Sequence, residues 1–363
     1  MQSFLIYLPF ILLKIIQKKI IDVKKIILAI VVIIFVLGAI GAYFVMKIIY
    51  LPNIQVPEGT VYIKIPTGAD YEDVKDTLYS KVIVENRKFF ELLADRKEYP
   101  QNIRPGRYKI NDGMSNNELI NLLRAGLQEP LNVTFHNART KENVAGVVSK
   151  KIEADSLNIL NLLNDDSFLS QFDKTNETVL TMLIPNTYEM YWNTSAEEFM
   201  KRMAVEYDRF WNNERLEKAD KIRLSPEKVS VLASIVEHET YKDSDKPKIA
   251  GVYLNRLDIN MPLQADPTLI WALKDFSIRR VLNEHKNIDS PYNTYKYAGL
   301  PPGPIGIPGI SSIDAVLNAE DHDYLYFVAK EDFSGYSSFS KTYAEHLEKA
   351  RRYQRELNKR NIK

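Results

Sequence analysis

The chain contains no cysteine, which excludes disulfides, thiolate metal ligands and a cysteine nucleophile. Histidine is also scarce. There are five histidines and none forms an H-E-x-x-H pair, so we expect no metal site. A G-x-S-x-G elbow and a phosphate-binding glycine loop are both missing, and we expect no cofactor. The net charge is only +1, which argues against a nucleic-acid partner bound through bulk charge. Acid–base chemistry by carboxylates is what remains.

Length and composition predict a membrane segment followed by about two folded domains. The chain has 363 residues, of which 45% are hydrophobic and 26% are charged, as is ordinary for a globular protein. The strands and helices expected after the membrane segment are intermixed, which indicates an α+β fold.

Residues 26–46 carry no charged side chain. As a helix this run is about 30 Å long, close to the thickness of the bilayer hydrocarbon. It is longer than the apolar region of a signal peptide and lacks a small-residue cleavage site, so we expect an uncleaved transmembrane helix. Residues 1–25 should be cytoplasmic or interfacial, because this segment contains Lys14, Lys18, Lys19, Lys24 and Lys25. The positive-inside rule then places the chain after residue 47 outside the cell.

Residues 47–128 are interpreted as a linker, Leu51 to Pro57, followed by a small α+β domain. Alternating apolar residues predict strands in VYIKIP, which starts at Val61, and in RPGRYKI at 104–110. Helices are predicted at 71–78, 87–93 and 116–124. This domain has no cluster of candidate catalytic residues.

Residues 129–350 are interpreted as a second, larger α+β domain. Periodicity predicts strands at 131–135 and 323–329, and helices at 141–152, 157–172, 196–211, 246–257, 269–273 and 313–318. The stretch LIPNTYEMYWNTS at 183–195 is rich in aromatic and amide side chains, which suits either a carbohydrate subsite or a packed loop. Residues 351–363 end a charged surface helix.

The stretch 225–240, SPEKVSVLASIVEHET, should organise this domain. Ser225 can cap a helix and Pro226 suits its first position. Residues 229–236 carry no charge, so we expect a buried central helix.

Glu237 is the first ionisable residue that follows the apolar part of this helix. It lies on the same side as a stripe of small side chains, which could form a floor for a ligand. We therefore expect Glu237 to occupy a water-poor site and to donate a proton to a leaving group. The alternative is a helix that simply ends in polar residues at the surface.

Glu239 lies two residues further on, about 200° around the helix, so both acids cannot serve one substrate atom. It falls on the apolar side of the helix, where it needs a partner such as Arg256 or a backbone donor. We interpret Glu239 as a structural acid.

Six motifs in this order resemble the membrane-anchored endolytic murein transglycosylases of the YceG-like (MltG) family. They are ASIVEHE at 233–239, VYLNRL at 252–257, MPLQADPT at 261–268, SPYNTY at 290–295, GLPPGPI at 299–305 and DYLYFVA at 323–329. The resemblance extends to about residue 350. It implies that the small domain is LysM-like and that residues 129–350 are the family's catalytic domain.

The resemblance implies a lyase that cleaves the MurNAc–GlcNAc β-1,4 bond within peptidoglycan glycan strands without water and leaves 1,6-anhydro-MurNAc ends. It also implies a single-pass protein of the cell (inner) membrane with an extracytoplasmic catalytic domain, which ends nascent strands beside peptidoglycan synthases. The family's catalytic glutamate matches Glu237. Its substrate-binding motifs match Asn186, Tyr188, Gln264, Asp266, Thr268, Asn293, Thr294 and Tyr295. The sequence departs from the family at Asn186, which replaces an aspartate, and at Ser337, which replaces a histidine.

One acid suffices for this reaction. Glycoside hydrolysis normally needs two carboxylates, whereas a transglycosylase replaces water by the C6 hydroxyl of the sugar. We expect Glu237 to protonate the glycosidic oxygen and then to accept the C6-hydroxyl proton, with intramolecular attack favoured by high effective concentration. Two alternatives remain: a hydrolytic muramidase with Asp266 as the second carboxylate, and a non-catalytic peptidoglycan-binding scaffold.

Overall fold

The computed structural model describes residues 4–136 and 138–360, with side chains from residue 12 onward. It divides into two units, residues up to 129 and residues from 130. Each unit has its own core of buried hydrophobic side chains. Both contain helices and strands, which agrees with the α+β class expected from the sequence.

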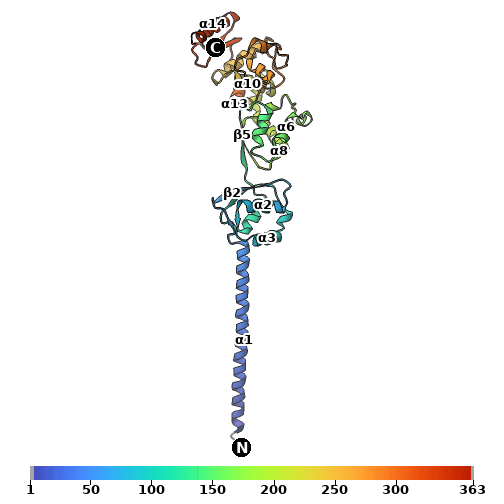
Figure 1. The fold of residues 1–363 in the computed structure, drawn as a ribbon, viewed down its shortest axis with the longest axis vertical. Helices are drawn as coiled ribbons and strands as arrows, with labels where there is room; N and C mark the ends of the chain where they lie inside the picture. Colours follow the sequence, from blue (N-terminus) through green and yellow to red (C-terminus); the bar gives the residue numbers. More distant parts are fainter. Residues whose placement is uncertain (1–3, 137, 361–363) are drawn as a thin grey trace. The chain divides into compact units, whose positions relative to one another are not determined.

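The described chain begins with helix α1, Phe4–Ile49, which runs without interruption (Figure 1). Its segment Leu12–Ile49 is apolar and long enough to cross a membrane, and the protein buries none of its apolar window. An apolar helix of this length suits a lipid environment. The helix expected at 26–46 is therefore present, but it continues through the lysine-containing residues before it, because lysine is a good helix former.

The rest of the first unit consists of three α-helices and two antiparallel pairs of strands. Strand β2, Thr60–Ile65, pairs with β4, Gly106–Asn111, as the alternating residues predicted. The prediction of a linker at 51–57 was wrong in part, because β1, Ile54–Gln55, pairs with β3, Ile83–Val84. The other elements are α2 (Tyr71–Lys81), α3 (Arg87–Arg96), the 3₁₀ helix η1 (Tyr99–Gln101) and α4 (Asn116–Ala125).

The second unit begins with a strand pair that sequence periodicity found only in part. Strand β5, Leu131–Phe135, was expected, but its antiparallel partner is β6, Asn186–Met190, within the stretch interpreted as a loop or subsite. The single helix expected at 157–172 was also wrong, because Asp165 ends one helix and caps the next. The helices here are α5 (Lys141–Val148), α6 (Ser156–Asn164), α7 (Asp166–Leu169), η2 (Ser170–Phe172), η3 (Val179–Met182), α8 (Ala196–Phe210) and α9 (Asn213–Lys221).

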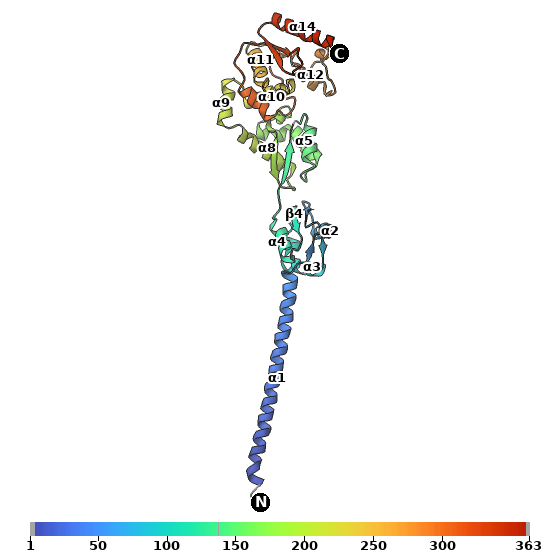
Figure 2. The same cartoon turned by 90° about the vertical axis from the view of Figure 1, so that its left-hand side faces the viewer.

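Helix α10, Pro226–Glu239, packs against α11 (Lys246–Asp258), α12 (Asp266–Leu273) and α13 (Ile310–Leu317). Figure 2 labels α10 together with α11 and α12. Strand β7, Tyr326–Ala329, pairs with β8, Ser337–Ser340, a strand that was not predicted because serines interrupt the apolar alternation. The elements are α11 (Lys246–Asp258), α12 (Asp266–Leu273), η4 (Asn283–Asn287), α13 (Ile310–Leu317), β7 (Tyr326–Ala329), β8 (Ser337–Ser340) and α14 (Tyr343–Lys359).

Helix α10 starts as its sequence indicates. The Ser225 side chain accepts a hydrogen bond from the backbone N–H of Lys228, and residues 229–236 are all buried. The stripe of small side chains is buried too, so the expectation that it forms a ligand floor was wrong. The Ser234 hydroxyl accepts a hydrogen bond of 3.0 Å from the Ile305 N–H, which holds the proline-rich loop at 299–309 over the helix. Glu237 is consequently the first partly exposed residue after this covered stretch.

Candidate active site

Glu237 lies in the last turn of α10, with 24% of its side chain exposed. Its carboxylate faces the end of the proline-rich loop. A Cβ atom added at Gly309 would lie 3.3 Å from Oε2 of Glu237, closer than most real Cβ contacts. A glycine at 309 therefore lets the loop pass beside the acid and shield one side of it from water.

Two hydrogen-bond donors reach Glu237 from other helices. The Ser312 hydroxyl on α13 donates to Oε2, and the Lys246 ammonium on α11 lies 3.3 Å from the same oxygen. Neither residue was singled out from the sequence. The sequence did contain a signal for both, since Ser312 lies three residues after the glycine–proline loop and Lys246 starts a helix nine residues after Glu237.

Arg139 approaches the same end of α10. A Cβ added at Gly306 would lie 3.4 Å from His238 Nε2 and 3.6 Å from Arg139 Cα, so both residues border the proline-rich loop. Burial and the positive charge of Arg139 lower the pKa of His238 to about 4, so His238 is neutral near pH 7. Within the described residues, the buried Nε of Arg139 has no hydrogen-bond partner, and its guanidinium lies 4.3 Å from the centre of the Phe276 ring.

Glu239 contacts a different set of side chains from Glu237. Its Oε1 accepts a hydrogen bond of 2.7 Å from the Tyr253 hydroxyl. Burial raises the pKa of Glu239 to about 7, against the opposing effects of the Tyr253 bond and of the Arg256 charge. Arg256, the partner expected from the sequence, instead donates to the carbonyls of Leu263 and Leu325, at 2.6 and 2.7 Å. Glu239 is thus bonded to a buried tyrosine, and its structural role stays a prediction.

Three of the residues expected to bind substrate are buried, Thr268 in the first turn of helix α12 and Asn293 and Thr294 in the loop after η4. The hydroxyls of Thr268 and Thr294 are 2.8 Å apart, and the Thr294 hydroxyl accepts a hydrogen bond of 3.0 Å from the Ala265 N–H. The Asn293 side chain donates to the Ile288 carbonyl at 2.8 Å. These residues are at most 1% exposed, so they fix the loop conformation and leave no surface for a ligand.

The other members of these motifs are accessible. Gln264 is exposed and has φ 52°, a left-handed conformation that costs free energy for a residue other than glycine, and such strain is frequent at functional sites. Asp266 is exposed and accepts a hydrogen bond of 2.6 Å from the hydroxyl of Tyr295. Two motifs distant in sequence therefore meet at one polar surface, which is held by the buried threonines beneath it.

The third group of expected substrate contacts lies on strand β6. Tyr188 is only 4% exposed, its ring is 5.6 Å from that of Phe135, and its hydroxyl donates to the Ile184 carbonyl. It is therefore a core residue, and a direct contact with substrate would require it to leave the core. Asn186 is exposed at the start of the strand. Ser337, where the family pattern differs, donates its backbone N–H to Asp245 at 2.7 Å.

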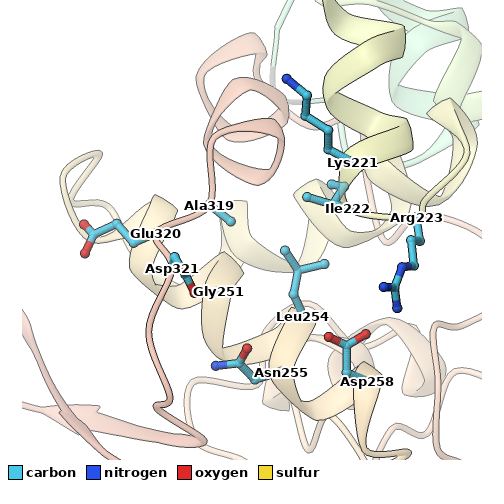
Figure 3. A pocket seen from close by; sticks show the side chains of 10 residues that line it. All are labelled: Lys221, Ile222, Arg223, Gly251, Leu254, Asn255, Asp258, Ala319, Glu320 and Asp321. Atoms are coloured by element: carbon cyan, nitrogen blue, oxygen red, sulfur yellow. The ribbon is translucent and has the colours of Figure 1, made fainter.

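Among the cavities in this unit, two that lie apart from Glu237 border the proline-rich loop or helix α11. One of about 480 Å³ lies between residues 289–297 and the proline-rich loop, and is lined by Asp289, Ser290, Pro291, Tyr297, Leu300 and Pro302. The other, of about 350 Å³, lies between the end of α9, helix α11 and the segment after α13 (Figure 3). Its charged lining has both signs, with Lys221 and Arg223 opposed by Asp258, Glu320 and Asp321, and it contains none of the residues expected to bind substrate.

Comparison with known proteins gives consistent matches. The model of the YceG-like family matches residues 63–352. The chain is 31% identical over 332 residues to an endolytic murein transglycosylase of Bacillus subtilis, covering 86% of this chain and 90% of the relative. It is 28% identical to the endolytic murein transglycosylase of Streptococcus pneumoniae D39, covering 85% of this chain but 61% of that longer protein. A solved structure of a YceG-like protein from Listeria monocytogenes superposes with a TM-score of 0.54 at 29% identity, over 80% of this chain and 99% of that one.

Proposed function

The chain belongs to the YceG-like family, and we propose that it is an endolytic murein transglycosylase, a lyase that cleaves within the glycan strands of peptidoglycan. The observation that carries this conclusion is the match to the Bacillus subtilis enzyme, which extends over nearly the full length of both chains. The pneumococcal relative has the same activity in its name. Glycan strands of peptidoglycan are therefore the substrate.

The reaction that we propose needs one carboxyl group. Glu237 protonates the glycosidic oxygen between MurNAc and GlcNAc, so that the C1–O bond breaks and the GlcNAc hydroxyl leaves. Its carboxylate then takes the proton from the C6 hydroxyl of the same MurNAc, whose oxygen bonds to C1 and forms the 1,6-anhydro ring. Attack within one sugar gains the high effective concentration of an intramolecular reaction. The partly exposed position of Glu237 beside the proline-rich loop supports this role.

Gln264, Asp266 and Tyr295 are the side chains that we propose to bind the sugars. They are polar, reach the surface, and come from the two motifs that the threonine contacts join. Thr268, Asn293 and Thr294 would act through these neighbours, since they are buried. We propose a similar indirect role for Tyr188, which supports the strand that carries Asn186.

The long apolar helix α1 is compatible with single-pass anchoring in the cell membrane. We propose a cytoplasmic N-terminus, supported by the lysines before the apolar run, and a catalytic unit on the extracytoplasmic side. The small unit would be a LysM-like domain that holds glycan strands, and it has the expected mixture of helices and strands. In this position the enzyme would end nascent strands close to peptidoglycan synthases.

The test is the Glu237→Gln variant of the full-length protein, purified in detergent and incubated with isolated peptidoglycan. We expect the wild type to release 1,6-anhydro-MurNAc products and the variant to release almost none, as measured by mass spectrometry. Anhydro products at the wild-type rate from the variant would refute the mechanism. Reducing MurNAc ends would instead identify a water-using muramidase, for which Asp266→Asn should be as inactive as Glu237→Gln. If the wild type itself retains peptidoglycan without cleaving it, the chain is a binding scaffold.

A further inference from the structure

We propose that Lys246 and Ser312 are positioning residues, which fix one oxygen of Glu237 so that the other transfers the proton. This inference rests on the function proposed above. It assigns a role to two side chains that lie outside all of the sequence motifs described here.

The two carboxylate oxygens of Glu237 have different surroundings. Oε2 receives the Ser312 hydroxyl and lies 3.3 Å from the Lys246 ammonium. Oε1 accepts no hydrogen bond within the described residues, and the carboxylate is partly exposed. A carboxyl group held by one oxygen cannot rotate freely, so Oε1 keeps a fixed direction and remains open to the glycosidic oxygen and then to the C6 hydroxyl.

Both donors are built into the fold and are not flexible surface side chains. Ser312 is fully buried, and Lys246 is only 5% exposed, which is rare for lysine without a partner. The ammonium has three acceptors within reach, one for each of its protons: Glu237 Oε2 at 3.3 Å, Asp243 Oδ1 at 2.9 Å and Ser311 Oγ at 3.3 Å. Lys246 thereby connects the ends of α10, α11 and α13.

The ammonium also has an electrostatic role in the first half of the reaction. As Glu237 gives its proton to the leaving group, negative charge develops on the carboxylate. A fixed positive charge beside Oε2 interacts more strongly with that developing charge than with the neutral acid, so it stabilises the transition state more than the ground state. Removing it should therefore lower kcat and leave substrate binding nearly unchanged.

The experiment measures kcat and KM for anhydro-product release from isolated glycan strands, using full-length protein in detergent. We expect Lys246→Met to lower kcat by about 100-fold and Ser312→Ala by about 10-fold, with KM changed by less than about twofold. Lys246→Arg should recover part of the loss, because arginine keeps the charge but not the geometry. Unfolding midpoints from tryptophan fluorescence identify any variant that fails to fold, and Ser312→Ala, which loses only one oxygen, then decides the outcome.

Two substitutions serve as controls. Lys248→Met removes a lysine from the same helix, where it pairs with Glu320 at 3.4 Å, and Ser230→Ala removes a buried hydroxyl from the other end of α10. Both should keep the wild-type kcat. Wild-type kcat in Lys246→Met and Ser312→Ala, or a rise in KM alone, would overturn the inference provided that Glu237→Gln is inactive. Activity in Glu237→Gln would refute the proposed function itself.

Discussion

Replacing Glu239 by glutamine should change how the stability of the second unit depends on pH. Burial raises the pKa of Glu239 to about 7, from an ordinary value of 4.5. Between these two values the folded protein keeps a proton that the unfolded chain has already lost. This acid therefore stabilises the fold at low pH, and its contribution declines as the pH rises through that window and stays level above pH 7. Glutamine does not titrate, yet it can still accept the hydrogen bond from Tyr253.

The size of the effect follows from the shift in pKa. Relative to the Glu239→Gln variant, the wild-type free energy of unfolding should fall by at most roughly 3 kcal/mol between pH 4.5 and pH 7. Residual water near the carboxylate reduces this figure. His238, with a pKa lowered to about 4, changes the free energy of unfolding in the opposite direction. Its stabilisation of the fold is present above pH 6.5 and is lost as the pH falls toward 4. His238 is present in both proteins, so its contribution cancels in the difference.

Urea unfolding followed by tryptophan fluorescence can measure this difference in full-length protein held in mild detergent. All three tryptophans, Trp192, Trp211 and Trp271, lie in the second unit, so the signal reports that unit. Tyr253→Phe is the matched comparison. It keeps the titrating carboxyl and removes its donor, so the pH dependence should persist and become larger. Parallel stability curves for wild type and Glu239→Gln from pH 4.5 to pH 8 would refute the reasoning.

Three further substitutions test the surroundings of the site. Gly309→Ala places a methyl group 3.3 Å from Oε2 of Glu237. It should lower kcat about tenfold with little effect on the unfolding midpoint. An unchanged kcat would show that the carboxylate has room to move. Gln264→Gly should raise the free energy of unfolding by about 1 kcal/mol, because glycine adopts the left-handed φ without strain. The same substitution should raise KM. A loss of stability would contradict the argument from strain. Tyr295→Phe should raise KM several-fold by releasing Asp266, and a fall in kcat at constant KM would show that this pair takes part in the chemistry instead.

Local sequence signals were sufficient to predict the helices whose formation depends on neighbouring residues in the chain. The cap at Ser225, the proline after it and the uncharged residues 229–236 specify α10 without help from the rest of the chain. The same holds for α1, where an uninterrupted apolar run is sufficient. Strand β6 was missed because residues 186–190 adopt a strand through pairing with β5, a partner more than fifty residues away. Periodicity within one short segment does not contain that information.

The candidate site was only partly predictable for the same reason. Motif residues identified which loops meet near the end of α10, but they did not reveal which side chains in those loops face outward. Thr268 and Thr294 have hydroxyls that suit a sugar, and the fold uses them to join the loops to one another. Lys246 and Ser312 belong to none of the sequence motifs. They come close to Glu237 only when helices α10, α11 and α13 pack together.

The roles of the two acids on α10 show how tertiary contacts complete what helical geometry begins. An angle of about 200° separates Glu237 from Glu239, which excludes a shared substrate atom but does not say which acid reacts. The packing gives the two acids different neighbours. Glu239 meets the hydroxyl of a buried tyrosine, whereas Glu237 meets a glycine, a buried serine hydroxyl and a buried ammonium group. We propose Glu237 as the acid that transfers a proton to a bound glycan, because a serine and a lysine from two other helices hold one of its oxygens beside the glycine–proline loop.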